Sequence, residues 1–200
     1  MEKLDIFYLD VCPIDRGGAN FEEIYNFGIC QKDYQRLKKS LFEIIKDLNT
    51  KPEDLLEFKE DYLVLKKIKE FSNFFKENIG YYPLRLQFYW AKRALKKESF
   101  SIIAPTGIGK STFGNILSHF YPGKVYYLVP SIILLRETEN KLKNIKSNKK
   151  ILVIKEKEDK ELLKQGDFDI LLTTSNFLHK NFDIIPKNFD LVFIDDADSL

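Results

Sequence analysis

The chain has 200 residues, of which 44% are hydrophobic and 31% charged, with a formal net charge of +2. This composition predicts a globular, cytoplasmic protein, and so small a net charge does not by itself indicate nucleic-acid binding. No apolar run approaches the roughly 20 residues that span a bilayer, the acidic N-terminus is unlike a signal peptide, and two cysteines are too few for a disulfide scaffold.

The first two regions of the chain differ in the composition and spacing of their residues. Residues 1–35 hold turn formers and both cysteines, so we expect an irregular segment there. Residues 36–79 carry apolar residues at helical spacing, which predicts a helical region. Within it Thr50 and Pro52 are typical of a helix start, and Gly80 closes the region.

Residues 80–200 alternate strand-like and helix-like segments. The expected strands are F-S-I-I-A, K-V-Y-Y-L-V-P, K-K-I-L-V-I-K, F-D-I-L-L-T-T and F-D-L-V-F-I-D-D. The expected helices are S-T-F-G-N-I-L-S-H-F, I-I-L-L-R-E-T-E-N-K-L-K-N-I and D-K-E-L-L-K-Q. Strand–helix alternation with continuous apolar strands predicts an α/β fold in which helices cover both faces of a parallel sheet.

A glycine loop follows the first of these strands. Ala104, Gly109, Lys110 and Ser111 fit the spacing of a P-loop, with alanine in place of the first glycine. Backbone amides would curl around a phosphate, Lys110 would reach the β- and γ-phosphates, and Ser111 would hold Mg²⁺. The alternative is a strand–turn–helix connection that is rich in glycine by chance. The expected nucleotide-binding residues of the loop are Thr106, Gly107, Gly109, Lys110, Ser111 and Thr112.

The segment D-D-A-D ends the last expected strand. Asp195 stands where a metal-holding carboxylate is expected, and Asp196 where a general base or water-positioning carboxylate is expected. Taken alone, the same segment could be a solvated turn.

Gln87 begins a helix that leads to the glycine loop. A glutamine there can give one hydrogen bond to adenine and accept one, and Tyr81 could stack on the base. The alternative is an exposed glutamine at the start of an amphipathic helix.

These segments together resemble a superfamily 2 helicase core and, more narrowly, reverse gyrase. The resemblance rests on G-Y-Y-P-L-R-L-Q-F-Y-W-A-K-R-A-L-K-K-E-S-F-S-I-I-A-P-T-G-I-G-K-S-T-F-G, with D-I-L-L-T-T-S-N-F-L and F-D-L-V-F-I-D-D-A-D. It implies a P-loop NTPase (RecA-like) domain that uses ATP and Mg²⁺. It also implies a motor that engages double-stranded DNA and drives positive supercoiling through an attached type IA topoisomerase. The match runs from about Phe74 to the end of the chain.

The resemblance also implies roles for particular residues. Lys110, Asp195 and Asp196 would be catalytic, Ser111 and Asp195 would serve Mg²⁺, and Gln87 would read adenine. The segments Pro130-Ser131 and Thr173-Thr174-Ser175 would touch the DNA backbone, although each could equally be a helix cap.

The N-terminus departs from the family pattern. The family usually opens with a four-cysteine zinc finger, whereas the matching positions here are Cys12, Asp15, Cys30 and Asp33. Two thiolates and two carboxylates can hold zinc, but the set is unusual. The sequence favours a degenerate finger held by packing over a zinc site at Cys12 and Cys30.

The C-terminus departs as well, since the chain ends just after the acidic strand. We expect a zinc-finger-like segment (1–35), a helical region (36–79) and an incomplete first RecA-like domain (80–200). The second RecA-like domain, with its arginine finger, and the topoisomerase module would lie in the same or a partner chain, so this chain would bind nucleotide better than it hydrolyses it. Two alternatives stay open: a free-standing superfamily 2 helicase or translocase, and a nucleotide-gated DNA-binding subunit without turnover.

Overall fold

The computed structural model describes residues 7–8, 12–47, 56–155 and 159–197. The chain forms two compact units, Met1–Asn73 with Pro83–Phe100 and Phe74–Tyr82 with Ser101–Leu200. The boundary between them falls inside the long helix α4 (Leu56–Ile79). The domain boundaries expected after residues 35 and 79 stay predictions, since compact units need not coincide with domains.

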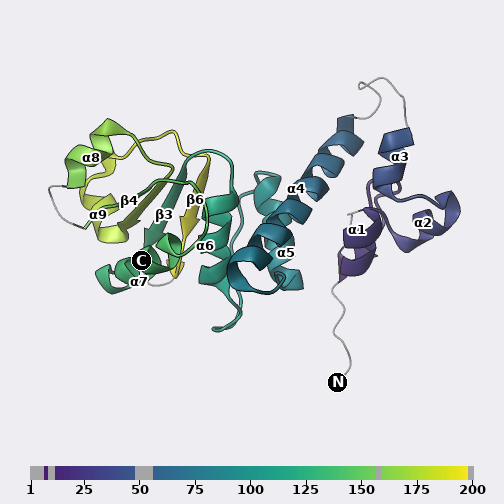
Figure 1. Ribbon diagram of the computed structural model, residues 1–200, viewed down its shortest axis with the longest axis horizontal. Helices are drawn as coiled ribbons and strands as arrows, with labels where there is room; N and C mark the ends of the chain where they lie inside the picture. Colours follow the sequence, from purple (N-terminus) through teal and green to yellow (C-terminus); the bar gives the residue numbers. More distant parts are fainter. Residues whose placement is uncertain (1–6, 9–11, 48–55, 156–158, 198–200) are drawn as a thin grey trace. The chain divides into compact units, whose positions relative to one another are not determined.

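The first unit is mainly helical (Figure 1). Two short strands pair antiparallel, β1 (Phe7–Tyr8) and β2 (Ala19–Asn20). The helices are α1 (Phe21–Phe27), α2 (Gln31–Leu37), α3 (Leu41–Asp47), most of α4, and α5 (Arg85–Leu95). One part of its core is a cluster of buried residues, Cys12, Ala19, Ile24, Ile29, Cys30, Leu41 and Leu65. Another is formed by Val64 and Ile68 of α4 with Phe88 of α5.

The expectation of an irregular segment over residues 1–35 is wrong, because α1 lies within it and α2 begins there. A capping box starts α1: the Asn20 side chain accepts from the Glu23 amide at 2.9 Å, and the Glu23 carboxylate accepts from the Asn20 amide at 2.9 Å. Gly28, with φ of 73°, ends the helix in the left-handed conformation that favours glycine.

The helical spacing found over residues 36–79 is confirmed by α3 and α4. The helix start expected at Thr50 and Pro52 lies outside the described residues. Gly80 ends α4 as expected: its φ is 95°, and its amide donates to the Lys76 carbonyl at 2.8 Å.

The second unit contains a four-stranded parallel sheet, which confirms the expected α/β fold (Figure 1). Its strands are β3 (Val125–Val129), β4 (Ile151–Val153), β5 (Ile170–Thr174) and β6 (Leu191–Ile194), in the order β4-β5-β3-β6. Its helices are α6 (Lys110–Phe120), α7 (Ile132–Lys143), α8 (Asp159–Gln165) and α9 (Ser175–Lys180), with a 3₁₀ turn η2 (Phe182–Ile184).

The strand expected at F-S-I-I-A is wrong, since residues 100–105 have no strand conformation. A strand requires a hydrogen-bonded neighbour, and no strand within the described ranges pairs with this segment. The Ile103 side chain is 97% exposed, so the segment lacks the burial that its apolar sequence predicts.

Helices cover both faces of the sheet, as expected. Tyr126 and Leu128 point to one face of β3, where they pack with Leu163 of α8, and Phe177 and Leu178 of α9 flank the same cluster. Tyr127 points to the other face, where its ring lies 5.0 Å from that of Phe193 in β6. On that face α6 approaches so closely that a Cβ added to Gly114 would lie 2.3 Å from the Phe193 ring.

Among the helices within the described ranges, none combines the length and apolarity that crossing a membrane requires.

Candidate functional site

The glycine loop has the backbone conformation that its sequence demands. Residues 106–107 form a turn, and Gly107 and Gly109 have φ values of 83° and 85°, in the left-handed region that favours glycine. A Cβ added to Gly107 would meet nothing within 4 Å, so the loop is open on that side. The main chain at Gly107 is therefore accessible on that side. Thr106 is exposed in the turn, whereas Ser111 and Thr112 are half-buried in the first turn of α6.

Lys110 is the first residue of α6, and its side chain folds back over the loop. The ammonium donates to the Ala104 carbonyl at 2.7 Å and to the Pro105 carbonyl at 3.3 Å. The N-terminal end of an α-helix also carries a partial positive charge. The loop thus gathers a cation and a helix N-terminus at one place, which favours a negatively charged ligand.

The direction of α6 follows from its connection to the sheet. Just after α6, the Lys124 amide donates to the Asp190 carboxylate at 2.8 Å, and these residues directly precede β3 and β6. The C-terminal end of α6 therefore lies at the edge where these strands begin. Because the helix runs antiparallel to the strands, Lys110 and Ser111 lie toward the edge where the strands end.

Asp195 lies at that same edge, directly after β6. About one helical turn, or 6 Å, separates Gly114 from Lys110, and about 7 Å of strand separates Phe193 from Asp195. Since Gly114 and Phe193 are in close approach, the glycine loop and the acidic end of β6 face a common space.

The Asp195 carboxylate is buried rather than solvated, with 8% of the residue exposed. Its Oδ2 accepts a hydrogen bond from the Tyr127 hydroxyl at 3.2 Å, and its amide donates to the Leu128 carbonyl at 2.9 Å. Burial, and then the charge of Asp195 and the hydrogen bond to it, raise the pKa of Tyr127 well above its ordinary value. The phenol therefore stays protonated and orients the carboxylate.

Asp196, the next residue, is exposed and has a φ of 49°. This left-handed conformation is uncommon for a residue other than glycine, and such outliers cluster at functional sites. This conformation turns the chain sharply after β6, so that the Asp195 carboxylate is buried while the side chain of Asp196 is exposed.

Gln87 belongs to the first unit, whereas the glycine loop belongs to the second. The alternative of an exposed Gln87 is wrong, because only 3% of the residue is exposed. Its Oε1 accepts from the Leu84 amide at 2.9 Å, which satisfies a backbone donor at the start of α5. Tyr81, in the second unit, is mostly exposed.

A pocket of about 550 Å³ lies where β3, β4 and β5 end. Its lining consists of Pro130, Ser131, Ile132, Ile154, Lys155, Thr174, Asn176, Phe177, Lys180 and Asn181. The structure thus brings together Ser131 and Thr174, from the two segments in which DNA-backbone contacts are expected. Both hydroxyls are also helix caps: Ser131 accepts from the Leu134 amide at 3.3 Å, and Thr174 from the Phe177 amide at 3.2 Å.

The sequence alone did not indicate four polar residues of this pocket, Lys155, Asn176, Lys180 and Asn181. Asn176 and Lys180 lie one turn apart on α9, and both are exposed. Lys155 follows β4 and forms an ion pair with Glu139 of α7 at 2.5 Å. The spacing of Asn176 and Lys180 after the cap at Thr174 could have indicated a polar face.

The sequence matches the family described as "Type III restriction enzyme, res subunit" over residues 59–198. The chain belongs to this family. The matched range takes in the glycine loop, the pocket and the acidic end of β6, so the family covers the whole candidate site.

Relatives confirm the resemblance to the helicase-like part of reverse gyrase. The reverse gyrase of Methanocaldococcus jannaschii is 36% identical over 98% of this chain and 13% of that protein. The reverse gyrase of Pyrococcus furiosus is 35% identical over 96% of this chain and 18% of that protein. Reverse gyrase 2 of Aquifex aeolicus is 44% identical over 67% of this chain and 12% of that protein. The chain thus spans less than a fifth of the length of these relatives.

Proposed function

We propose that this chain is the ATP-binding, DNA-engaging motor portion of a reverse gyrase, in which ATP hydrolysis drives positive supercoiling by an attached type IA topoisomerase. One observation carries the proposal: a glycine loop with its lysine and a buried carboxylate lie at the same edge of a parallel sheet. Ligands of open α/β sheets bind at this edge, where the strands end.

ATP and Mg²⁺ fit the residues present, because the loop is open beside Gly107 and a buried carboxylate faces it. Lys110 would hold the β- and γ-phosphates, and Ser111 and Asp195 would hold the metal. The triphosphate supplies the free energy of hydrolysis when it is bound. Thr106, Gly107, Gly109 and Thr112 complete the loop.

Tyr127 is a positioning residue in this proposal. Its hydroxyl donates to one oxygen of Asp195, which leaves the other oxygen for a metal. Asp196, exposed on its strained backbone, orients the attacking water as a general base.

Gln87 is the proposed adenine-reading residue. Its Oε1 already accepts from the Leu84 amide, so recognition of the base exchanges this hydrogen bond or uses the amide group of the side chain. Tyr81 offers an exposed ring for stacking.

The pocket at the ends of β3, β4 and β5 is the proposed contact with the phosphates of double-stranded DNA. As helix caps, the Ser131 and Thr174 hydroxyls accept hydrogen bonds, so each can still donate its proton to a phosphate oxygen. The side chains of Asn176 and Lys180 add further contacts. Such contacts do not depend on base sequence, as a motor that moves along DNA requires.

We expect Lys180→Ala to lower the affinity for duplex DNA about fivefold, since one hydrogen bond from a cation to a phosphate is lost. The slope of log affinity against log salt should fall by about 1. Fluorescence anisotropy over a salt series measures both quantities. Lys164→Ala, which removes an exposed lysine of α8 outside the pocket, is the control. Equal losses in the two variants would contradict the proposed DNA contact.

Titration calorimetry of the 200-residue chain with ATP tests the nucleotide site itself. We expect saturable heat in the presence of Mg²⁺ and weaker binding after chelation, since Ser111 and Asp195 bind nucleotide only through the metal. Circular dichroism establishes that the sample is folded. A folded chain that gives no saturable heat with ATP and Mg²⁺ would overturn the proposed function.

A further inference from the structure

The parallel sheet ends on one side at β6, and this edge is apolar (Figure 1). Among the described strands, β6 pairs with β3 alone. Its side chains Val192 and Ile194 are 54% and 45% exposed, whereas their partners in β3, Tyr126 and Leu128, are buried. The apolar face of the sheet therefore extends beyond the helices that cover it. An exposed apolar edge of this kind is a template for pairing with a further strand.

The connections of this sheet tie each face to one direction of crossing. Nearly all connections between parallel strands are right-handed, so the face on which the joining helix lies follows from the direction in which the chain crosses the sheet. The helix α7 leads from β3 to β4 and contacts α6, which covers the Tyr127 face. The helices α8 and α9 join strands in the opposite direction, toward β6, and pack on the other face.

The same rule assigns a place to residues 101–104, which precede the glycine loop. The helix α6 leads from this segment to β3 on the same face as α7, so the chain crosses from the β6 side of β3. Since β6 already occupies the place beside β3, residues 101–104 belong beyond β6. They nevertheless have no strand conformation and pair with no described strand, and Ile103 is 97% exposed.

We propose that the edge of β6 binds a helix followed by an apolar strand, and that this strand lies parallel to β6 and between β6 and residues 101–104. A crossing that leaves β6 in this direction has the same direction as that of α9, so its helix lies on the face of Val192 and Ile194. One occupant thus covers both exposed side chains and supplies the neighbour that residues 101–104 need to form a strand.

The occupant is the polypeptide that follows the acidic end of β6 in a longer form of the protein. A right-handed crossing begins at the end of a strand, and β6 is the edge strand on this side. The relatives have ample chain for such a unit, since this chain spans 13% of the reverse gyrase of Methanocaldococcus jannaschii and 18% of that of Pyrococcus furiosus.

Occupation of the edge also acts on the glycine loop, an effect that rests on the proposed function. Residues 101–104 lead directly into the loop, and the Lys110 ammonium donates to the Ala104 and Pro105 carbonyls. Pairing of residues 101–104 fixes the main chain before the loop, as α6 fixes it after the loop. Because a loop that is already ordered loses less conformational freedom on binding, ATP binds more tightly to the completed sheet.

Amide hydrogen exchange, followed by mass spectrometry, tests the edge without nucleotide or DNA. The 200-residue chain is compared with a chain extended by about 40 residues, enough for a helix and a strand, from the polypeptide that follows the matched region in the M. jannaschii protein. We expect the amides of residues 101–104 to exchange at least about 100-fold more slowly in the extended chain. Titration calorimetry should show about tenfold tighter binding of ATP and Mg²⁺.

Two substitutions show whether the apolar edge carries the effect. In the extended chain, Ile194→Lys should abolish the protection of residues 101–104, because it places a charge under the added helix. Leu162→Lys, which changes an equally exposed leucine of α8, is the control and should leave the protection unchanged.

The outcomes separate this proposal from the proposed function. Protection without tighter ATP binding would overturn the effect on the nucleotide and leave the edge as proposed. The edge proposal is wrong if residues 101–104 gain no protection in a folded extended chain, or if they are already protected in the 200-residue chain, where they would pair with β6 directly. It is also wrong if ultracentrifugation shows that the 200-residue chain is a dimer that Ile194→Lys dissociates, since a second copy would then cover the edge.

Discussion

We expect Lys110→Ala to lower the affinity for ATP and Mg²⁺ roughly 100-fold while the fold survives. Lys110 would form charge-assisted hydrogen bonds to two phosphate groups, and two such bonds contribute about 3 kcal/mol or more. In the protein itself the ammonium contacts only the Ala104 and Pro105 carbonyls among the bonds described for it, both within its own loop. Loss of these contacts from a half-exposed loop should lower the free energy of unfolding by only about 1 kcal/mol.

Lys141→Ala is the matched control, since it removes an exposed lysine from α7 of the same unit. Titration calorimetry measures affinity, and urea unfolding followed by circular dichroism measures stability. Unchanged ATP affinity in Lys110→Ala would mean that the nucleotide site is misplaced. An equal loss of affinity in Lys141→Ala would point to net charge rather than to the loop.

The strands and helices of the second unit could be predicted because the spacing of apolar residues along each element matches the sides on which that element is buried. β3 and β5 are buried along most of their length, so each appears in the sequence as a continuous run of apolar residues. The glycine loop was equally predictable, because Gly107 and Gly109 adopt backbone angles that other residues rarely do.

Two features of the fold, the absence of a strand at residues 100–105 and the burial of Gln87, could not be predicted from the local sequence. Residues 100–105 have the composition of a buried strand, yet strand formation needs a paired neighbour, which a local pattern cannot supply. Gln87 is polar at a helix start, which is compatible with exposure, but the fold buries the residue. Its side chain accepts from the Leu84 amide, a local capping bond that the sequence analysis did not consider.

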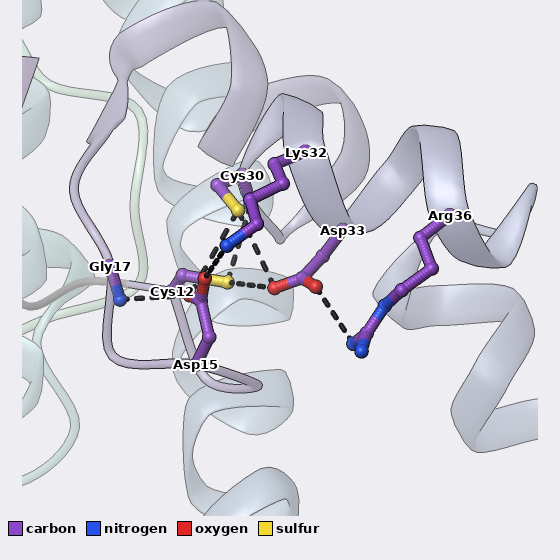
Figure 2. A network of polar contacts seen from close by, with 7 residues as sticks. All are labelled: Cys12, Asp15, Gly17, Cys30, Lys32, Asp33 and Arg36. Carbon is purple, nitrogen blue, oxygen red and sulfur yellow. Dashed lines mark hydrogen bonds and ion pairs between the residues drawn. The ribbon is translucent and has the colours of Figure 1, made fainter.

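In the candidate sites too, the sequence identifies residues that are close together in the chain but not those that only the fold brings together. The P-loop residues are contiguous, so spacing alone identifies them. Tyr127 lies 68 residues before Asp195 in the chain, and only strand pairing between β3 and β6 brings its hydroxyl to that carboxylate. Cys12 and Asp33 lie 21 residues apart in the chain, and they are likewise brought together only by the fold (Figure 2).

The close approach of α6 to β6 gives the second large prediction. A Cβ on Gly114 would lie 2.3 Å from Cε1 and Cζ of Phe193, well inside contact distance. Gly114→Ala must therefore displace the ring or the helix, at a cost of about 1–3 kcal/mol. It gains about 1 kcal/mol of helix propensity, so the free energy of unfolding should fall by up to about 2 kcal/mol. Because a displaced α6 carries Ser111 away from Asp195, affinity for ATP and Mg²⁺ should fall as well.

A double-mutant cycle with Phe193→Ala isolates the cause. Phe193→Ala removes the three atoms that lie nearest to a Cβ at position 114. Gly114→Ala should therefore now stabilise the protein by up to about 1 kcal/mol through helix propensity. The sign of the substitution therefore reverses between the two backgrounds, with a coupling energy of about 2 kcal/mol, within the range for residues in contact. Urea unfolding of the four proteins measures the coupling. A substitution that destabilises both backgrounds equally would show that glycine is needed at this position for some reason other than the Phe193 ring, and that the ring does not set the spacing between α6 and β6.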